Sequence, residues 1–191
     1  MKCALPVGEV SIDSYPDRLT LTPLIASTRE YPRSLAALGS KINQLDLLEL
    51  TRRFLFYQLN PTSAIEPDNL TLAACPMIWD SKVSVFHSAT ATFRAPSNPS
   101  GPGGMYREVI RSTPFWSKGD IPGPRRDCVF VDVGNSEGAG MRNLLVARVY
   151  LFFRFSYNGV KYPCTLVHWY TTSDAPDAAT GYWVVQPEYN R

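Results

Sequence analysis

The sequence has no long apolar run. Its 191 residues contain no stretch of about 18 apolar residues, the minimum for a helix that crosses a bilayer. The apolar stretch near the N-terminus, residues 4–7, is too short for a secretory signal peptide. We therefore expect an intracellular protein without a membrane partner.

Paired cysteines are also lacking. Cys3, Cys75, Cys128 and Cys164 stand far apart without Cys-x-x-Cys spacing, which in an intracellular protein is typical of reduced thiols. Cys164 and His168 are four residues apart on an expected strand, so about 13 Å separates them. A zinc ion, with bonds of about 2 Å, does not reach both. We predict no metal and no cofactor.

A strong charge of either sign is missing as well. The formal net charge is +2, well short of the basic excess that identifies a nucleic-acid-binding protein from composition. With 45% hydrophobic residues the chain has enough apolar surface to fold, and its length suits about one domain. Prolines break up residues 1–33. The expected organisation is an irregular N-terminal arm (1–33) and a single α+β domain (34–191), with a helical part (34–112) and a β meander (127–189).

One main helix is predicted near residues 43–59. Leucines recur there at helical spacing: Leu45, Leu48, Leu55 and Leu59 form one stripe, flanked by Leu47, Leu50 and Phe54. Asn43 would cap the first turn. Glu49 lies one turn before Arg52 and Arg53, so it is placed to pair with them while both arginines face solvent.

Residues 82–94 alternate loosely between apolar and polar types, which predicts one strand. His87 lies in it among small apolar residues. No acidic residue shares its strand period, so a core or edge histidine is favoured over a general base. Residues 105–112 favour a short helix with Arg107 and Arg111 one turn apart, and the prolines after it predict an irregular segment.

The strongest local signal is Asn158-Gly159 between two β-branched and aromatic runs, because a type I′ turn needs positive φ at both central residues. The expected pairs are Tyr157 with Val160, Phe155 with Tyr162, Phe153 with Cys164, Leu151 with Leu166, and Val149 with His168. These side chains would share the core face of an antiparallel sheet or partial barrel. The opposite face would carry a mixture of aromatic and basic groups: Arg154, Phe152, Tyr150 and Arg148 against Pro163, Thr165, Val167 and Trp169. It would be only partly covered, or it would bind something, and Arg148 could form a cation–π pair with Trp169.

A glycine-rich loop, Gly134 to Gly140, follows an expected strand at residues 128–133. A nucleotide-binding loop must open a helix whose first amides hold the phosphate. The next run, residues 144–157, is β-branched and aromatic and favours a strand. A hairpin loop is the preferred interpretation, and a small hydrolase or nucleotide-binding enzyme using this loop is the alternative.

Six short segments together resemble one known family. They are 86–93 (FHSATATF), 103–108 (GGMYRE), 140–142 (GMR), 146–149 (VARV), 162–169 (YPCTLVHW) and 180–185 (TGYWVV). Their order is similar to the C-terminal accessory region of fungal Kyakuja-Dileera-Zisupton (KDZ) transposase-like proteins, over roughly residues 43–191. The resemblance implies descent from a mobile element and a nuclear location. It does not imply transposase activity, because the catalytic carboxylates of those enzymes lie in a different region.

The sequence therefore predicts a β-rich α+β domain that acts as a non-enzymatic interaction module for a protein or a nucleic acid. The candidate binding residues are Arg107, Arg111, Arg125, Arg126, Arg148 and Trp169, with the arginines on phosphates and the indole stacked on a base. The resemblance leads us to expect a further β segment beyond Arg191. Tyr182 to Tyr189 would then form an open sheet edge that invites self-association or a protein partner, unless the N-terminal arm covers it.

Overall fold

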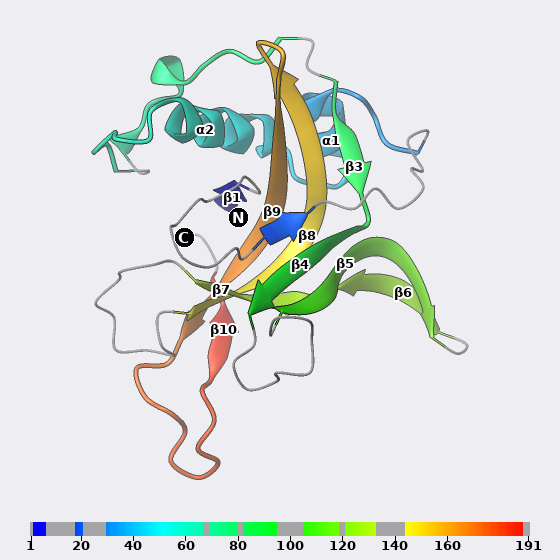
Figure 1. Cartoon of the computed structure of the whole chain (residues 1–191), viewed down its shortest axis with the longest axis vertical. Coiled ribbons are helices and arrows are strands. Elements are labelled where there is room, and N and C mark those ends of the chain that lie inside the picture. Colours follow the sequence, from blue (N-terminus) through cyan, green and yellow to red (C-terminus); the bar gives the residue numbers. More distant parts are fainter. Residues whose placement is uncertain are drawn as a thin grey trace.

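A computed structural model describes residues 2–6, 18–20, 30–66, 69–79, 82–94, 105–118, 121–132 and 144–188. The helices are α1 (Leu35–Lys41), α2 (Leu47–Leu59) and a short 3₁₀ helix, η2 (Leu72–Ala74). The strands are β1 (Lys2–Pro6), β2 (Arg18–Thr20), β3 (Ser84–Phe86), β4 (Ser88–Arg94), β5 (Met105–Lys118), β6 (Ile121–Arg126), β7 (Cys128–Asp132), β8 (Leu144–Tyr157), β9 (Val160–Thr172) and β10 (Val185–Pro187). This is the β-rich α+β fold that the sequence predicts (Figure 1).

The strands form two antiparallel sheets. Sheet A is centred on the long hairpin β8–β9; β1 and β10 pair with the outer edge of β9, while β3 and β7 pair with the outer edge of β8. Sheet B has the order β2-β4-β5-β6. In the described part of the chain neither sheet closes into a barrel. Within sheet B, β5 and β6 extend away from the rest of the molecule as a curved ribbon (Figure 1).

The two sheets meet at a corner where the chain passes from one to the other. His87 separates β3 of sheet A from β4 of sheet B, and Asp127 separates β6 of sheet B from β7 of sheet A. At the corner Ser112 N donates to His87 O (2.8 Å), and Val149 N donates to Asp127 O (3.0 Å). The single strand predicted for residues 82–94 is therefore wrong, because it bends at His87. Strands that switch sheets at a bend are typical of orthogonally packed β structures.

The β8–β9 hairpin confirms the predicted turn. Asn158 has a φ of 48° and Gly159 a φ of 79°. Four of the five predicted pairs are correct, from Tyr157 with Val160 to Leu151 with Leu166. The fifth is wrong, because a register shift between Val149 and Leu151 places Val149 opposite Val167. A β-bulge of this kind leaves one residue, here Tyr150, without a cross-strand partner.

Replacing Gly159 with valine should lower the free energy of unfolding by about 1–2 kcal/mol, the cost of a left-handed backbone for a residue with a side chain. Nothing lies within 4 Å of the position that a Cβ would take, so backbone strain alone should cause the loss. Urea denaturation measures it. Gly159→Asn is the matched control, because asparagine tolerates positive φ. Equal losses for the two variants would contradict this cause.

One core lies between sheet A and the helices. This helix-side core consists of Leu35, Leu38, Leu47, Phe54, Leu55, Val83, Val85, Leu151, Phe153, Phe155, Cys164 and Leu166. The predicted flanking residues Leu47 and Phe54 are buried, and Leu50 packs against the core. The predicted leucine stripe is half wrong: Leu55 is buried and Leu48 packs against the core, whereas Leu45 is 80% exposed and Leu59 is also exposed. The reason is that residues 43–59 are not one helix: Asn43 has a φ of 57° in the turn after α1, and α2 begins only at Leu47. The turn changes which residues face the sheet.

A second core lies between sheets A and B. This inter-sheet core consists of Phe86, Ala89, Val131, Ala147, Val149, Phe152 and Val167. Phe152 and Val167 lie on the face of the hairpin that the sequence analysis expected to be partly open. That expectation is wrong for these residues, because the folded-over sheet B buries them.

Two further expectations are corrected. Residues 105–118 form strand β5 rather than a short helix, and Ile121–Arg126 pairs with it as β6 despite its prolines. Proline is tolerated there because β6 pairs on only one side in the described structure. The arm at residues 1–33 is not wholly irregular, since it supplies β1 to sheet A and β2 to sheet B.

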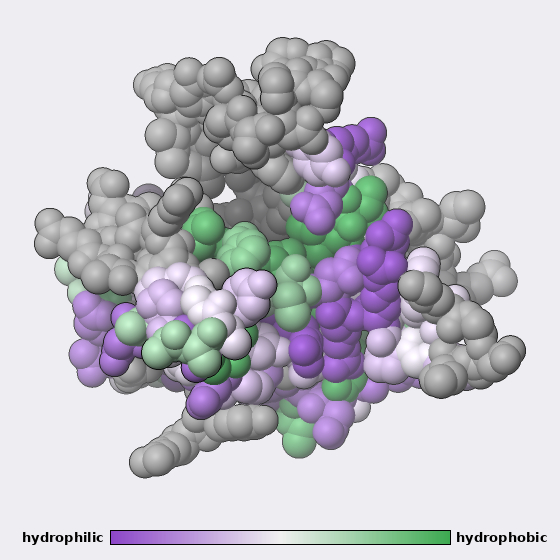
Figure 2. Space-filling model, turned by 90° about the horizontal axis from the view of Figure 1, so that it is seen from below, coloured by the Kyte–Doolittle hydropathy of each residue, from purple (hydrophilic) through white to green (hydrophobic). Residues whose placement is uncertain are grey.

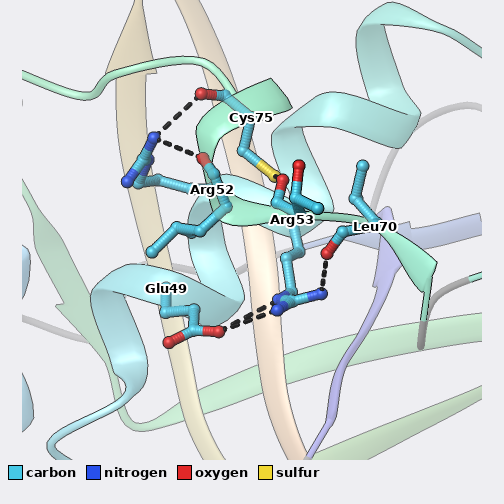
Figure 3. Close-up of polar contacts among 7 residues, drawn as sticks. Glu49, Arg52, Arg53, Leu70 and Cys75 are labelled. Atoms are coloured by element: carbon cyan, nitrogen blue, oxygen red, sulfur yellow. Dashed lines mark hydrogen bonds and ion pairs between the residues drawn. The ribbon is translucent and has the colours of Figure 1, made fainter.

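Arg52 does not face solvent as expected; it binds the segment after α2 (Figure 3). Its guanidinium donates at 2.8–2.9 Å to three carbonyl oxygens, those of Leu72, Cys75 and Pro76. Arg53 forms the expected ion pair with Glu49 at 2.9 Å. Arg52 thus joins α2 to η2 and to the residues directly after it, in addition to the backbone hydrogen bond from Cys75 N to Leu72 O.

Among the described helices, none has the length and apolar character needed to cross a lipid bilayer.

Candidate functional site

The helices cover only one end of sheet A. Leu166, His168 and Tyr170 alternate along β9 and so point to one face, on which Leu166 belongs to the helix-side core. Past that core the same face carries Arg148, opposite His168, and Cys128, opposite Arg148. The end of sheet A at which β7 pairs lies away from α1 and α2 (Figure 1).

Aromatic and basic side chains gather on this end of the sheet, which we call the platform. The platform consists of Arg126, Cys128, Phe130, Arg148, Tyr150, His168 and Tyr170. Phe130 is 64% exposed and pairs with Val146, which pairs in turn with Tyr170. The platform therefore spans three neighbouring strands, β7, β8 and β9, with Arg126 reaching it from β6.

The rings of the platform form a continuous ladder. The His168 ring lies between Tyr150 and Tyr170, with ring centroids 6.2 Å and 5.9 Å apart. A guanidinium covers a ring at each end: Arg126 Cζ lies 4.1 Å from the Tyr150 centroid, and Arg148 Cζ lies 5.6 Å from that of Tyr170. Such cation–π contacts fix the orientation of a guanidinium. They use the face of the group and leave most of its N–H donors available.

Local hydrogen bonds fix two members of the ladder. His168 Nε2 lies 2.7 Å from the carbonyl oxygen of Glu188, so Nε2 carries the proton in this contact. A side-chain hydrogen bond with Cys128 raises the pKa of Arg148 above its usual value, against an opposing effect of desolvation. Arg148 and Arg126 are both exposed and remain cations at neutral pH.

The structure divides the six residues proposed from the sequence. Arg126 and Arg148 lie on the platform, whereas Arg107, Arg111 and Arg125 lie on the β5–β6 ribbon. Trp169 packs against the inter-sheet core on the opposite face of sheet A. The predicted Arg148–Trp169 pair is wrong: Trp169 lies opposite Ala147, and Arg148 stacks on Tyr170.

Tyr150 was expected on the same face as Arg148, but Phe130, His168 and Tyr170 were not predicted as members of the site. The shift at Tyr150 moves Arg148, His168 and Tyr170 onto one face, and no local signal in the sequence marks it. Phe130 was detectable, because it alternates with Val129 and Val131 along an expected strand and so had to face away from the side that they bury.

The other chemical hypotheses gain no support from the geometry. The loop from Gly134 to Gly140 lies outside the described residues, and the next element is strand β8 rather than a helix. His87 is half-buried beside Tyr31, at 5.7 Å between ring centroids. No group of three or more His, Cys, Asp or Glu side chains placed to hold a metal occurs in the described part of the chain.

One open cavity of about 400 Å³ lies beside the start of α1. Leu35, Ala36, Leu48 and Ile78 form its apolar wall, and Arg33 and Lys82 stand at it. Ser34 also lines it, and its Oγ accepts a hydrogen bond from the backbone N–H of Ala37 at 3.3 Å.

Comparison of this chain with protein-family models, with curated proteins and with solved structures gave no match in any of the three.

Proposed function

We propose that this protein is a non-enzymatic interaction module that binds single-stranded nucleic acid on the platform. The observation that supports this most directly is the exposed ring of Phe130 on the same face as the ladder. Arg126 covers the ring at one end of that ladder, and Arg148 covers the ring at the other end. Stacking of unpaired bases on aromatic rings, together with arginines on the phosphates, is the common chemistry of proteins that bind single strands.

Two physical features favour a single strand over a duplex. Bases stack on a protein ring only when they are unpaired and splayed out, and each such contact contributes about 1–3 kcal/mol. The face of a sheet presents rings side by side, at the spacing of neighbouring strands of about 4.8 Å. The tyrosines hold both guanidiniums in place, which lowers the entropy lost when these bind phosphate.

The resemblance to the accessory region of KDZ transposase-like proteins extends this proposal. Descent from a mobile element would account for a nucleic-acid ligand and for a nuclear location. The enzyme alternative depended on the loop from Gly134 to Gly140, which lies outside the described residues, and no observation favours it.

Fluorescence anisotropy with a labelled single-stranded oligonucleotide tests the proposal. Phe130→Ala should weaken binding by about 5- to 100-fold, the loss of one stacking contact. Arg148→Gln should weaken it for all base sequences alike and reduce the slope of log K against log salt by about 1.

Lys161→Gln is the control for Arg148→Gln. It also removes one exposed cation, but at the turn end of the hairpin, away from the platform. It should leave the affinity within about twofold and the salt slope unchanged. The proposal fails if the wild-type protein does not bind single strands at physiological salt, or if Lys161→Gln and Arg148→Gln lower the affinity equally.

A further inference from the structure

The β5–β6 ribbon carries a second aromatic and basic surface. Trp116 is 38% exposed, and two guanidiniums lie over its ring: Arg125 Cζ at 4.8 Å from the centroid and Arg111 Cζ at 5.7 Å. The neighbouring Phe115 is 74% exposed, and Arg107 is exposed on the same strand. The ribbon thus repeats the combination found on the platform.

Asp127 holds this second surface in a fixed geometry. Its Oδ1 accepts from Arg125 Nε at 2.9 Å, and its Oδ2 accepts from the backbone N–H of Arg111 at 2.8 Å. The ion pair offsets part of the charge of Arg125. Arg111 then supplies the main attraction for an anion beside Trp116, while Arg125 chiefly orients the indole.

The ribbon and the platform are joined by two consecutive residues. Arg125 and Arg126 are neighbours on β6, and their side chains leave opposite faces of the strand, as alternation requires. Arg125 stacks on Trp116 of the ribbon, and Arg126 stacks on Tyr150 of the platform. Two consecutive residues of β6 thus contact the Trp116 ring on one side of the strand and the Tyr150 ring on the other.

The end of the molecule that carries β10 shows hydrophilic and hydrophobic residues close together in the space-filling view (Figure 2). A band of hydrophilic side chains lies directly beside a hydrophobic patch (Figure 2).

We infer that one single-stranded nucleic acid runs from the platform onto the β5–β6 ribbon, so that Trp116 forms a second stacking site for the same strand. This inference rests on the proposed function and gives the two surfaces different roles. Short strands bind the platform alone, and only longer strands also reach the ribbon. A duplex is not the expected ligand, because its bases are not available to Phe115 and Trp116.

A length series tests the inference with the full chain. Single-stranded oligonucleotides of about 4 and about 16 nucleotides span the usual size range of such sites. Phe130→Ala should weaken the binding of both lengths. Trp116→Ala should leave the short oligonucleotide within about twofold and weaken the long one by about 5- to 100-fold.

Trp79→Ala is the matched control, since Trp79 is exposed on the segment between η2 and β3 and should affect neither length. Circular dichroism shows that each variant is folded. An unchanged affinity of Trp116→Ala for the long oligonucleotide, or an equal loss at both lengths, overturns the inference and leaves the platform intact. Tighter binding of a duplex that depends on Trp116 also overturns it. Failure of the wild-type protein to bind any single strand overturns the proposed function itself.

Discussion

Replacing Phe153 with alanine should lower the free energy of unfolding by about 3–5 kcal/mol, the usual cost of removing a buried phenyl ring. Phe153 is fully buried in the helix-side core and pairs with Cys164 in the centre of the hairpin. Phe153 lies on β8 between β3 and β9, so the sheet has little freedom to move into the cavity that the alanine would leave. Denaturant unfolding followed by circular dichroism measures the loss.

Phe130→Ala is the matched control for this prediction. It removes the same ring from the same sheet, but from an exposed position, and surface substitutions usually change stability by no more than about 0.5 kcal/mol. The small effect also makes Phe130→Ala suitable for the binding experiments. Similar destabilisation by the two variants would show that the helix-side core is placed wrongly.

Replacing Arg52 with methionine should lower the free energy of unfolding by about 1.5–3 kcal/mol, the range for hydrogen bonds made by a charged group. The change leaves the carbonyl oxygens of Leu72, Cys75 and Pro76 without the donor that the guanidinium supplies. Methionine keeps much of the aliphatic volume, so the lost hydrogen bonds dominate. The measurement is again the free energy of unfolding in urea.

Arg107→Met controls for the general effect of exchanging arginine for methionine. Arg107 is exposed on β5, and this variant should remain within about 0.5 kcal/mol of the wild type. Arg52→Lys should lose stability as well, because an ammonium group does not reproduce the fork that reaches three acceptors. Full stability of Arg52→Met would mean that water replaces the guanidinium without cost.

The local features of the fold follow from short-range chemistry and were predictable. The Asn158-Gly159 turn needs positive φ at two positions, and few sequences meet that need. It set four cross-strand pairs and the core face of the hairpin. The predicted strand at residues 128–133 and the strand after the glycine-rich loop have the same origin, in β-branched and aromatic runs.

The errors arise where distant segments compete with local preference. Residues 105–112 carry a weak helical pattern, but β4 offers a complete set of backbone partners, and residues 105–118 extend as a strand. In residues 43–59 the leucines fit several helical phases. Which of them are buried was decided by the turn at Asn43 and by the sheet beneath α2.

For the candidate site, the sequence by itself determined the residue types: arginines at 107, 111, 125, 126 and 148, among aromatic strands. Only the tertiary structure decided how they are grouped. A one-residue shift at Tyr150 turns Arg148 toward Tyr170 and away from Trp169, because side chains alternate with a period of two and any shift exchanges the faces. The pairing of β6 with β5, and the passage of the chain into sheet A after Asp127, then decide that Trp116 lies under Arg125 and Tyr150 under Arg126. Neither event has a local signature, since each depends on strands that pair across the whole length of the chain.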